Sequence, residues 1–338
     1  MHQKSMNMND TEILFRQVEN ATTITIKNPF FKDVITGLTS REKFFSSKYF
    51  YDEAGDALFQ QIMQSHEYYP TRCEMEIFVG QHIALAAAMR AQQGDFDLVE
   101  LGAGDAVKTH FLLKYLLAVE TKFVYKPIDI PENIITYLET KLPAMLPGLR
   151  IEGLKGDYIP MLKKVRLASN RRKIVLFLGS SIGNMTMPQA AEFCVQIRKT
   201  LADGDMLLIG ADLRKDPRII LAAYNDECGL TKQFNLNLLT RINRELGADF
   251  DIRQFEHFPT YDPKTGSCKS YLISIREQVV KIGPHVITFQ KDEVIDMEIS
   301  QKYTLEDIRS LAAGAGFKPV ADFYDRKQWF LDTLWVAV

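Results

Sequence analysis

A glycine turn and four acidic side chains form the part of the sequence best suited to chemistry. The turn reads GAGDAVKT at residues 102–109, and the acids are Glu100, Asp105, Asp129 and Asp157. Val107 stands where a phosphate-binding P-loop and a GxGxxG dinucleotide turn both need a glycine. A phosphate favours backbone N–H groups and cations, whereas a cation favours carboxylates. The turn is therefore predicted to hold a cationic ligand without a phosphate.

Asp129 lies roughly 25 residues after the glycines, where a nucleoside-binding Rossmann domain places the carboxylate that binds ribose hydroxyls. Asp157 suits an adenine amino group, and Tyr158 suits packing on its ring. S-adenosylmethionine carries a nucleoside, a sulfonium cation and an amino-acid tail, so it fits better than NAD or ATP. Each acid taken alone is more often a loop carboxylate or a helix cap. Because all four acids fall at or close to strand ends, the sequence favours ligand binding over these commoner roles.

The chain from residue 96 to residue 227 alternates short apolar runs with amphipathic runs. This pattern predicts right-handed βαβ units and a mostly parallel sheet covered by helices on both faces. The expected strands are FDLVEL, KFVYKPIDI, KIVLFLGS and DMLLIGADL. Ligands of such sheets bind outside the carboxyl ends of the strands, where the glycine turn and the acids fall.

Two segments break the alternation. An aromatic-rich segment precedes residue 80, and a helical stretch from Phe234 to Leu246 is followed by strand-like runs that look antiparallel, DIRQFEHFPTYD, SCKSYLISIREQVV, HVITFQ and VIDMEIS, with DPKTG as a hairpin turn. The first pattern then resumes with a helix capped by Thr304. We expect an α/β fold with a Rossmann-like core at 80–212 and 302–338, and a second, α+β substrate domain built from 1–79 and 213–301.

The composition is that of a globular protein, with 338 residues, 46% hydrophobic and 25% charged. A net charge of −2 gives no basic stripe for nucleic acid. No stretch approaches the roughly 18 consecutive apolar residues of a membrane span, and the N-terminus lacks a secretion signal. The four cysteines lack metal-ligand or disulfide spacing, so we expect reduced core thiols and no metal. We expect a cytoplasmic monomer without nucleic-acid or membrane partners.

Residues 40–338 resemble the histidine Nα-methyltransferase family of the ergothioneine pathway. The matching stretches include KFFSSKYFYDEAGDALFQQI, EYYPTRCEMEIF, ELGAGDAVKT, FLGSSIGN, GADLRKDPRIILAAYND and MEISQKY. The family transfers methyl groups from S-adenosylmethionine to the α-amine of L-histidine. The resemblance implies a class I methyltransferase core, L-histidine as the substrate and its trimethylated betaine as the product.

The resemblance also assigns residues to ligands. It implies cofactor contacts by Gly102, Lys108, Asp129, Asp157 and Tyr158, the last where Phe is more frequent. It implies contacts with the amino-acid head group by Tyr68, Asn184, Tyr224 and the Gly179 backbone. Glu298 and Ser300 would face the side chain, since a carboxylate and a hydroxyl suit a ring that donates and accepts. Tyr51 is expected to line the pocket, and either Tyr51 or a water chain would take the amine proton.

Without the resemblance, an aromatic packing corner for EYYPTR and a strand-to-loop turn for GSSIGN would be favoured over substrate binding. One stretch departs from the family, because Lys269, Ser270 and Tyr271 replace a Glu-Met-His-like run that contributes a methionine to the pocket. A fungal relative methylates a tryptophan derivative, which is the alternative substrate here. A nicotinamide-dependent oxidoreductase is disfavoured by the missing glycine, and a silent binding module by the intact substrate residues.

Overall fold

The structure is a computed structural model that describes residues 28–338, so part of the expected segment 1–79 lies outside the described residues. The chain divides into two compact units. The first unit contains the described residues up to 65, together with 224–260 and 269–298. The second contains 66–223, 261–268 and 299–338.

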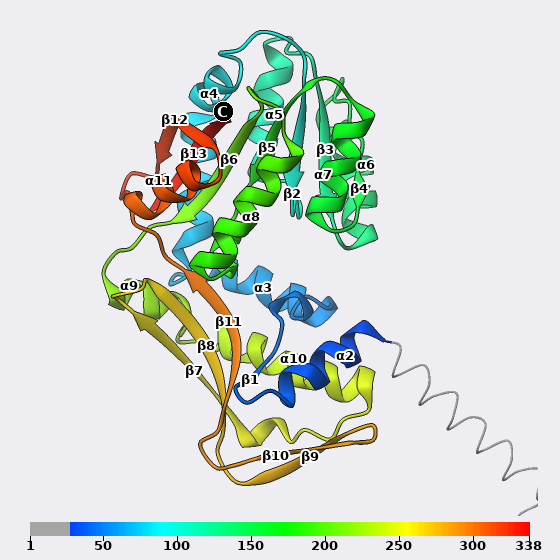
Figure 1. The fold of residues 1–338 in the computed structure, drawn as a ribbon, viewed down its shortest axis with the longest axis vertical. Helices are drawn as coiled ribbons and strands as arrows, with labels where there is room; N and C mark the ends of the chain where they lie inside the picture. Colours follow the sequence, from blue (N-terminus) through cyan, green and yellow to red (C-terminus); the bar gives the residue numbers. More distant parts are fainter. Residues whose placement is uncertain (1–27) are drawn as a thin grey trace, which may run out of the picture. The chain divides into compact units, whose positions relative to one another are not determined.

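A seven-stranded sheet, counted among the described residues, forms the centre of the second unit (Figure 1). Its strands, in spatial order, are β12 (Phe317–Tyr324), β13 (Phe330–Ala337), β6 (Met206–Asp212), β5 (Arg172–Phe177), β2 (Phe96–Leu101), β3 (Phe123–Asp129) and β4 (Leu154–Lys155). β13 is antiparallel to β6 and β12, and the other neighbours are parallel. The expected mostly parallel sheet is confirmed.

Helices cover both faces of this sheet. Figure 1 shows α7, α8 and α11 on one face, with α4 and α5 behind. The helices of the second unit are α4 (Tyr69–Met89), α5 (Thr109–Ala118), α6 (Glu132–Met145), α7 (Tyr158–Ala168), η2 (Ser181–Asn184), α8 (Met187–Thr200), α9 (Pro217–Ala223) and α11 (Leu305–Gly314). Because both faces are covered, all six residues of β2 are buried.

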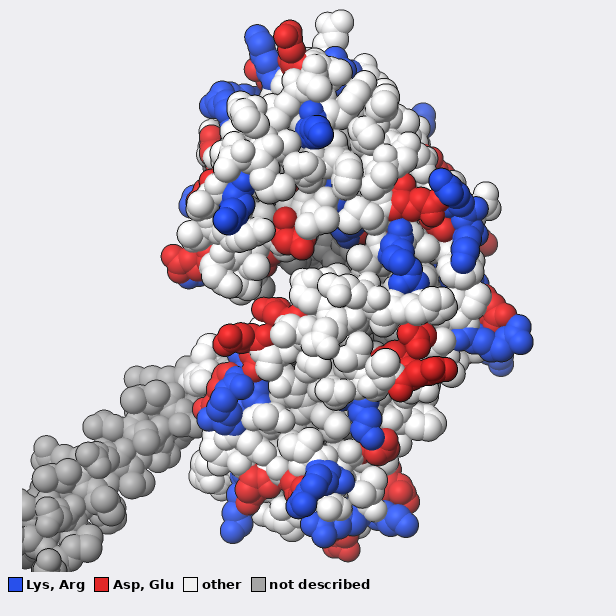
Figure 2. Space-filling view, turned by 180° about the vertical axis from the view of Figure 1, so that it is seen from behind, with Lys and Arg blue, Asp and Glu red and all other residues white. Residues whose placement is uncertain are grey.

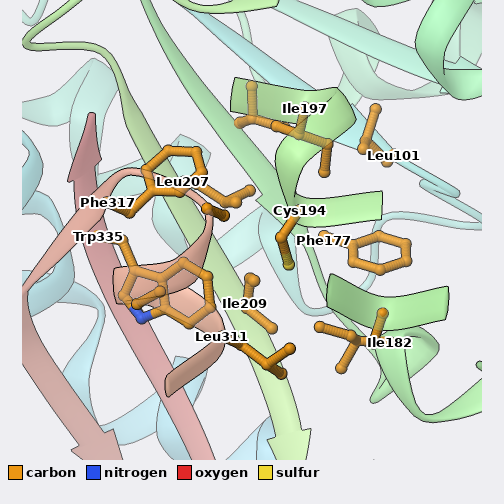
Figure 3. Packing of buried hydrophobic residues seen from close by; sticks show 14 of the residues in the cluster. Leu101, Phe177, Ile182, Cys194, Ile197, Leu207, Ile209, Leu311, Phe317 and Trp335 are labelled. Carbon is orange, nitrogen blue, oxygen red and sulfur yellow. The ribbon is translucent and has the colours of Figure 1, made fainter. Parts of the chain in front are cut away.

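The core beside α8 and α11 fixes the strand ends that precede the predicted site. Figure 3 shows Cys194 of α8 among apolar residues of β5, β6 and β13. Leu101 and Phe177, the last residues of β2 and β5, are each 1% exposed in this cluster. The loops that follow them therefore start from immobile points of the core.

The strand order reverses at β2. The chain continues from β2 to β3 and β4 on one side, and returns to β5 and β6 on the other. In open parallel sheets, ligands bind at the carboxyl ends of the strands beside such a reversal. Gly102 follows β2 and Gly179 follows β5 by two residues, so both lie at this position.

The first unit combines helices with strands. A four-stranded sheet in the order β1-β11-β8-β7 has most of its residues in this unit, and β9 and β10 form an antiparallel hairpin. The elements are α2 (Pro29–Leu38), β1 (Lys43–Phe44), η1 (Ser47–Tyr49), α3 (Glu53–Gln64), α10 (Leu230–Leu246), η3 (Ile252–Gln254), β7 (Phe255–Asp262), β8 (Ser267–Ser274), β9 (Gln278–Ile282), β10 (His285–Phe289) and β11 (Val294–Gln301).

Asp52 ties two helices of the first unit together. Its carboxylate caps α3 by accepting the Gly55 N–H at 2.9 Å. It also accepts from the Asn237 amide at 2.7 Å and from the Arg244 guanidinium at 2.6 Å, both on α10. The local helix cap is thus also a tertiary contact.

The unit boundaries differ from the expected domain boundaries. The helix α4 is continuous from Tyr69 to Met89 and packs on β6, β12 and β13, so residues 66–79 group with the second unit. Residues 213–223, 261–268 and 299–301 also group with it. That the first unit is a substrate domain stays a prediction.

Two smaller expectations are wrong. The run SCKSYLISIREQVV is not one strand, because the chain turns after Ser274, whose hydroxyl donates to the Arg276 carbonyl at 2.8 Å, and β9 starts at Gln278. Cys228 is exposed, whereas Cys73, Cys194 and Cys268 are buried free thiols.

The surface in Figure 2 shows Lys and Arg side chains interspersed with Asp and Glu, as the small net charge predicts. Within residues 28–338, no helix is both long enough and apolar enough to span a membrane.

Candidate methyl-donor and amino-acid sites

The glycine turn after β2 depends on backbone that side chains rarely adopt. Gly102 has φ +70° and Gly104 has φ +53°. A Cβ on Gly102 would lie 2.7 Å from the Tyr158 hydroxyl oxygen, so this glycine also allows close approach. Asp105 is exposed and accepts the Val107 N–H at 3.2 Å, which closes the turn locally.

Asp129 lies at the end of β3 beside the same turn. One carboxylate oxygen accepts the Gly104 N–H at 3.2 Å, and the other accepts the Ile130 N–H at 2.8 Å. Burial raises the pKa of this carboxyl, although the two N–H groups act against that rise. A half-buried carboxylate held against a glycine turn is the arrangement that binds ribose hydroxyls.

Asp157 and Tyr158 begin α7 at the next strand end. Asp157 is exposed, and its side chain makes no capping bond with the helix. The Tyr158 ring lies 6.0 Å from the Phe177 ring and 6.4 Å from the Phe193 ring, measured between centroids. Burial raises the pKa of the Tyr158 phenol to about 12. The pair therefore offers a solvent-facing acid and a fixed aromatic ring above Gly102.

Lys108 is engaged by a buried carboxylate. Glu74 of α4 is fully buried, pairs with the Lys108 ammonium and accepts the Gly179 N–H at 2.7 Å. Burial disfavours the Lys108 ammonium, but Glu74 outweighs this and raises the Lys108 pKa. The Lys108 charge is therefore neutralised beside the loop that follows β5.

Asp332 of β13 adds a second carboxyl group to this cluster. A Cβ on Gly210 would come within 2.3 Å of a Glu74 oxygen and 3.0 Å of an Asp332 oxygen, so the two carboxyls are neighbours. Burial and then the Glu74 charge raise the Asp332 pKa well above its usual range. Burial and the neighbouring Glu74 therefore favour the protonated form of Asp332.

Glu100 contradicts the expectation that it joins the ligand-binding acids. Its side chain points into the second unit, where it accepts from the Thr109 hydroxyl at 2.7 Å and the Tyr125 hydroxyl at 2.6 Å. Glu100 is 3% exposed, and burial raises its pKa to about 7. Successive side chains of β2 point to opposite faces of the sheet, and this alternation directs the Glu100 side chain into the core rather than toward solvent.

The loop after β5 brings predicted substrate residues toward β11. Gly179 and Ser180 both have positive φ, at +73° and +55°, and they lead into η2, which ends at Asn184. A Cβ on Gly183 would lie 3.0 Å from the Gln301 carbonyl oxygen. The η2 turn therefore packs directly on the end of β11, where Ser300 is located.

Ser300 is backed by a buried charge cluster. The Lys302 ammonium donates to the Ser300 hydroxyl at 2.8 Å and pairs with Asp212 at 2.7 Å. Lys215 also pairs with Asp212, and the Tyr69 hydroxyl donates to the Asp212 carboxylate at 2.8 Å. Burial would raise the Asp212 pKa, but Lys302 and Lys215 outweigh it and lower that pKa.

Tyr68 precedes Tyr69 at the start of α4 and is half-buried. Its phenol lies close enough to affect the Lys302 charge. The second unit thus brings Tyr68, Ser300 and the η2 turn that carries Asn184 into one region of the molecule.

The remaining predicted residues, Tyr51, Tyr224 and Glu298, belong to the first unit. Tyr51 is 41% exposed, and its ring makes edge contacts with Phe59 at 5.5 Å and Phe234 at 5.6 Å. Tyr224 is 8% exposed. Glu298 accepts from the Ser270 hydroxyl at a long 3.5 Å.

Sequence reasoning missed Glu74, Asp332, Asp212 and Lys302. Asp332 lies inside the apolar run WFLDTLWVAV, which predicted only packing, and Glu74 lies in the aromatic-rich segment before residue 80. A signal for Lys302 was present, since Glu298, Ser300 and Lys302 alternate along an extended segment and such residues share a face.

A parallel sheet with a glycine turn, a strand-end carboxylate and a following acid–aromatic pair defines a class I S-adenosylmethionine-dependent methyltransferase. The family described as "Histidine-specific methyltransferase, SAM-dependent" matches residues 30–337. The chain belongs to this family of enzymes.

Similar proteins agree with this membership. The histidine N-alpha-methyltransferase of Mycolicibacterium smegmatis is 35% identical over 301 residues, which cover 86% of this chain and 92% of the relative. The protein of the same name from Mycobacterium tuberculosis is 34% identical and covers 89% and 90%. An L-tryptophan methyltransferase of Psilocybe serbica is 29% identical and covers 83% and 85%.

Proposed function

We propose that this enzyme transfers methyl groups from S-adenosylmethionine to the α-amine of L-histidine, in three rounds, to give the trimethylated betaine. Family membership carries the substrate class. The observation that carries the donor is the Asp129 carboxylate held against the Gly102–Gly104 turn, in a loop that lacks the third phosphate-binding glycine.

The second unit would hold the donor. Asp129 would bind the ribose hydroxyls, Asp157 the adenine amino group, and Tyr158 would pack on the adenine ring. Gly102 allows the backbone to approach the ligand. Lys108 would bind the carboxylate of the donor's amino-acid tail without presenting a net positive charge to the sulfonium, because Glu74 neutralises it.

The substrate would be held by its head group and its ring. Tyr68, Asn184, Tyr224 and the Gly179 backbone are proposed for the α-carboxylate and the α-amine. Glu298 and Ser300 are proposed for the imidazole, which donates through one nitrogen and accepts through the other. Two phenols and an amide bind a carboxylate without adding a cation near the donor.

The donor supplies a methyl group on a sulfonium, so the protein's task is to align the amine with that carbon and to exclude water. The amine must be unprotonated before each transfer. We propose that Tyr51 relays its proton, with a water chain as the other route. Tyr51 is more than one-third exposed, so such a proton can pass to solvent.

The direct test is mass spectrometry of the products after incubation with S-adenosylmethionine and the twenty amino acids. Histidine is expected to gain three methyl groups, with matching release of S-adenosylhomocysteine. Methylation of another amino acid, or binding without that release, would contradict the proposal.

Glu298→Ala tests the ring assignment. We expect kcat/KM for histidine to fall at least tenfold, because an imidazole N–H loses a charged acceptor worth about 1.5–3 kcal/mol. Asp296→Ala is the matched control, since Asp296 lies on the same strand but pairs with Lys269 at 2.6 Å. A similar loss in both variants would show that Glu298 acts through strand stability alone.

A second candidate substrate is a tryptophan derivative. It is favoured by Lys269, Ser270 and Tyr271, which replace the family's usual run, and Ser270 lies against Glu298. The mixture of amino acids above includes tryptophan itself, and a parallel incubation with a tryptophan derivative separates the two candidates. We further propose that the enzyme acts in the cytoplasm as a monomer.

A further inference from the structure

Glu74 is a buried carboxyl group between two loops of the second unit. It is 0% exposed, and its two oxygens have different partners. One accepts the Gly179 N–H at 2.7 Å, and the other pairs with the Lys108 ammonium. A Cβ on Gly179 would lie 3.8 Å from that ammonium. The Lys108 charge therefore lies beside the loop after β5 and at the end of the glycine turn after β2, where the strand order reverses.

The neighbouring carboxyl of Asp332 differs from Glu74 in its surroundings. Burial and then the Glu74 charge raise the Asp332 pKa well above its usual range. Two adjacent buried carboxyls rarely ionise together, because each charge opposes the other. Glu74 accepts from an ammonium and a backbone N–H, and both donors stabilise a carboxylate. These contacts favour Glu74 as the member of the pair that carries the negative charge.

The donor loses one charge in the reaction. S-adenosylmethionine has a sulfonium, whereas S-adenosylhomocysteine, which remains after methyl transfer, has a neutral thioether at the same position. An ammonium without a counter-charge would repel the sulfonium and leave the thioether almost unaffected. An ammonium paired with a carboxylate avoids this repulsion. The charge next to Lys108 therefore bears differently on the two ligands.

We propose that Glu74 is a positioning residue that, through its pair with Lys108, sets the preference of the site for S-adenosylmethionine over S-adenosylhomocysteine. This inference rests on the proposed function, in which Lys108 binds the tail of the donor. It goes beyond that function because it assigns the discrimination between donor and by-product to one residue. It also separates the roles of two adjacent carboxyls, Glu74 and Asp332.

Calorimetric binding of S-adenosylmethionine and of S-adenosylhomocysteine, each at pH 7.5 without an amino acid, tests the inference. The measured quantity is the ratio of Kd for the sulfonium ligand to Kd for the thioether ligand, in which losses common to both cancel. A unit charge about 10 Å away changes an affinity by roughly tenfold at an effective dielectric constant of about 20. With Glu74→Gln and Asp332→Asn combined, neither carboxyl can ionise, so the ratio should rise at least about fivefold above wild type.

Asp332→Asn alone is the matched control, because asparagine replaces a carboxyl whose protonated form is favoured. Its ratio should stay within about twofold of wild type. Glu74→Asp keeps the charge but shortens the side chain, so both affinities should fall while the ratio stays near that of wild type. Glu100, which also affects the Lys108 charge, is retained in every variant.

Two results would overturn the inference. One is an unchanged ratio in the combined variant, which would mean that Glu74 supports the fold without acting on the charge of the site. The other is a raised ratio in Asp332→Asn, which would place the negative charge on Asp332. The second result requires no change at Glu74, so it decides the inference even if the Glu74 variants do not fold.

Lys108→Met tests the underlying assignment separately. Lys108 is proposed to bind the carboxylate that both ligands carry, so this variant should weaken both at least tenfold, since hydrogen bonds between charged groups are strong. Unchanged binding of both ligands would mean that Lys108 does not hold the donor. That outcome would contradict the proposed function at this residue, and it differs from a failure of the Glu74 inference, in which only the ratio is at issue.

Discussion

Asp129 shows how one carboxylate shapes a turn and remains available to a ligand. Its oxygens each accept one backbone N–H, and its partial burial strengthens any further bond it makes. Asp129→Ala should weaken S-adenosylhomocysteine binding at least tenfold in calorimetry, since hydrogen bonds to charged groups contribute about 1.5–3 kcal/mol.

The exposed Asp105 of the same loop provides the control for Asp129. Asp105→Ala loses only the bond to the Val107 N–H, and we expect a change below about threefold. Amino-acid binding should change less than donor binding in Asp129→Ala. Equal losses for the two ligands would mean that Asp129 maintains the fold and does not hold the donor.

Glu100 links a buried carboxyl to stability. Its folded pKa of about 7 lies above the unfolded value of about 4.3, so folding favours its protonated form. This contribution is present at low pH and is lost as pH rises from about 4.3 to about 7. The free energy of unfolding lost in this way by pH 8 is at most about 4 kcal/mol.

Glu100→Gln should therefore reduce the loss of unfolding free energy between pH 5 and pH 8, because the glutamine oxygen accepts from one of the Thr109 and Tyr125 hydroxyls, its amide N–H donates to the other, and the side chain does not ionise. Urea denaturation at both pH values measures this. Asp332, whose pKa is also raised, gives a slope of the same sign that remains in the variant. An unchanged slope would show that Glu100 is ionised in the folded protein at neutral pH.

At the scale of elements, helix α11 has a complete capping box. The Thr304 hydroxyl accepts the Asp307 N–H at 3.0 Å, and the Asp307 carboxylate accepts the Thr304 N–H at 2.8 Å. Asp307 also pairs with Arg214 at 3.3 Å. We expect Thr304→Ala to lower the free energy of unfolding by about 1 kcal/mol. Thr304→Ser keeps the hydroxyl and should lose less than half of that amount in the same urea titration.

Local pattern predicted the strands β2, β3, β5 and β6 because each is buried on both faces and reads as an apolar run. It did not predict α4. This helix buries Glu74, Ile77 and Phe78 together, so its apolar residues do not form one stripe.

Contacts between distant segments account for the rest of what the sequence did not reveal. The Glu100 side chain points inward, where Thr109 and Tyr125 are its hydrogen-bond partners. The sequence of the strand that carries Glu100 does not reveal either partner. Likewise, the partner that fixes the charge of Lys302 is Asp212, on a different strand. A single sequence shows residue types and spacing, but not these pairings.

At the scale of the whole molecule, the proposed donor contacts all belong to one unit. A ligand that binds only the folded state adds about 2.7 kcal/mol to the free energy of unfolding when its concentration is one hundred times Kd. Hydrogen exchange with S-adenosylhomocysteine and no amino acid should therefore protect the segments after β2, β3 and β4 of the second unit. Protection concentrated in residues 230–246 of the first unit would contradict the assignment of the donor.

The strand β13 lies inside its sheet, between β12 and β6, although it is formed by residues 330–337. During synthesis β6 consequently remains an unpaired edge until those residues have left the ribosome, and Trp335 is missing from the apolar cluster for the same period. A nascent chain halted before residue 330 would expose the unpaired edge of β6, which can pair with strands of other chains. Chaperone dependence should therefore be greatest for that intermediate.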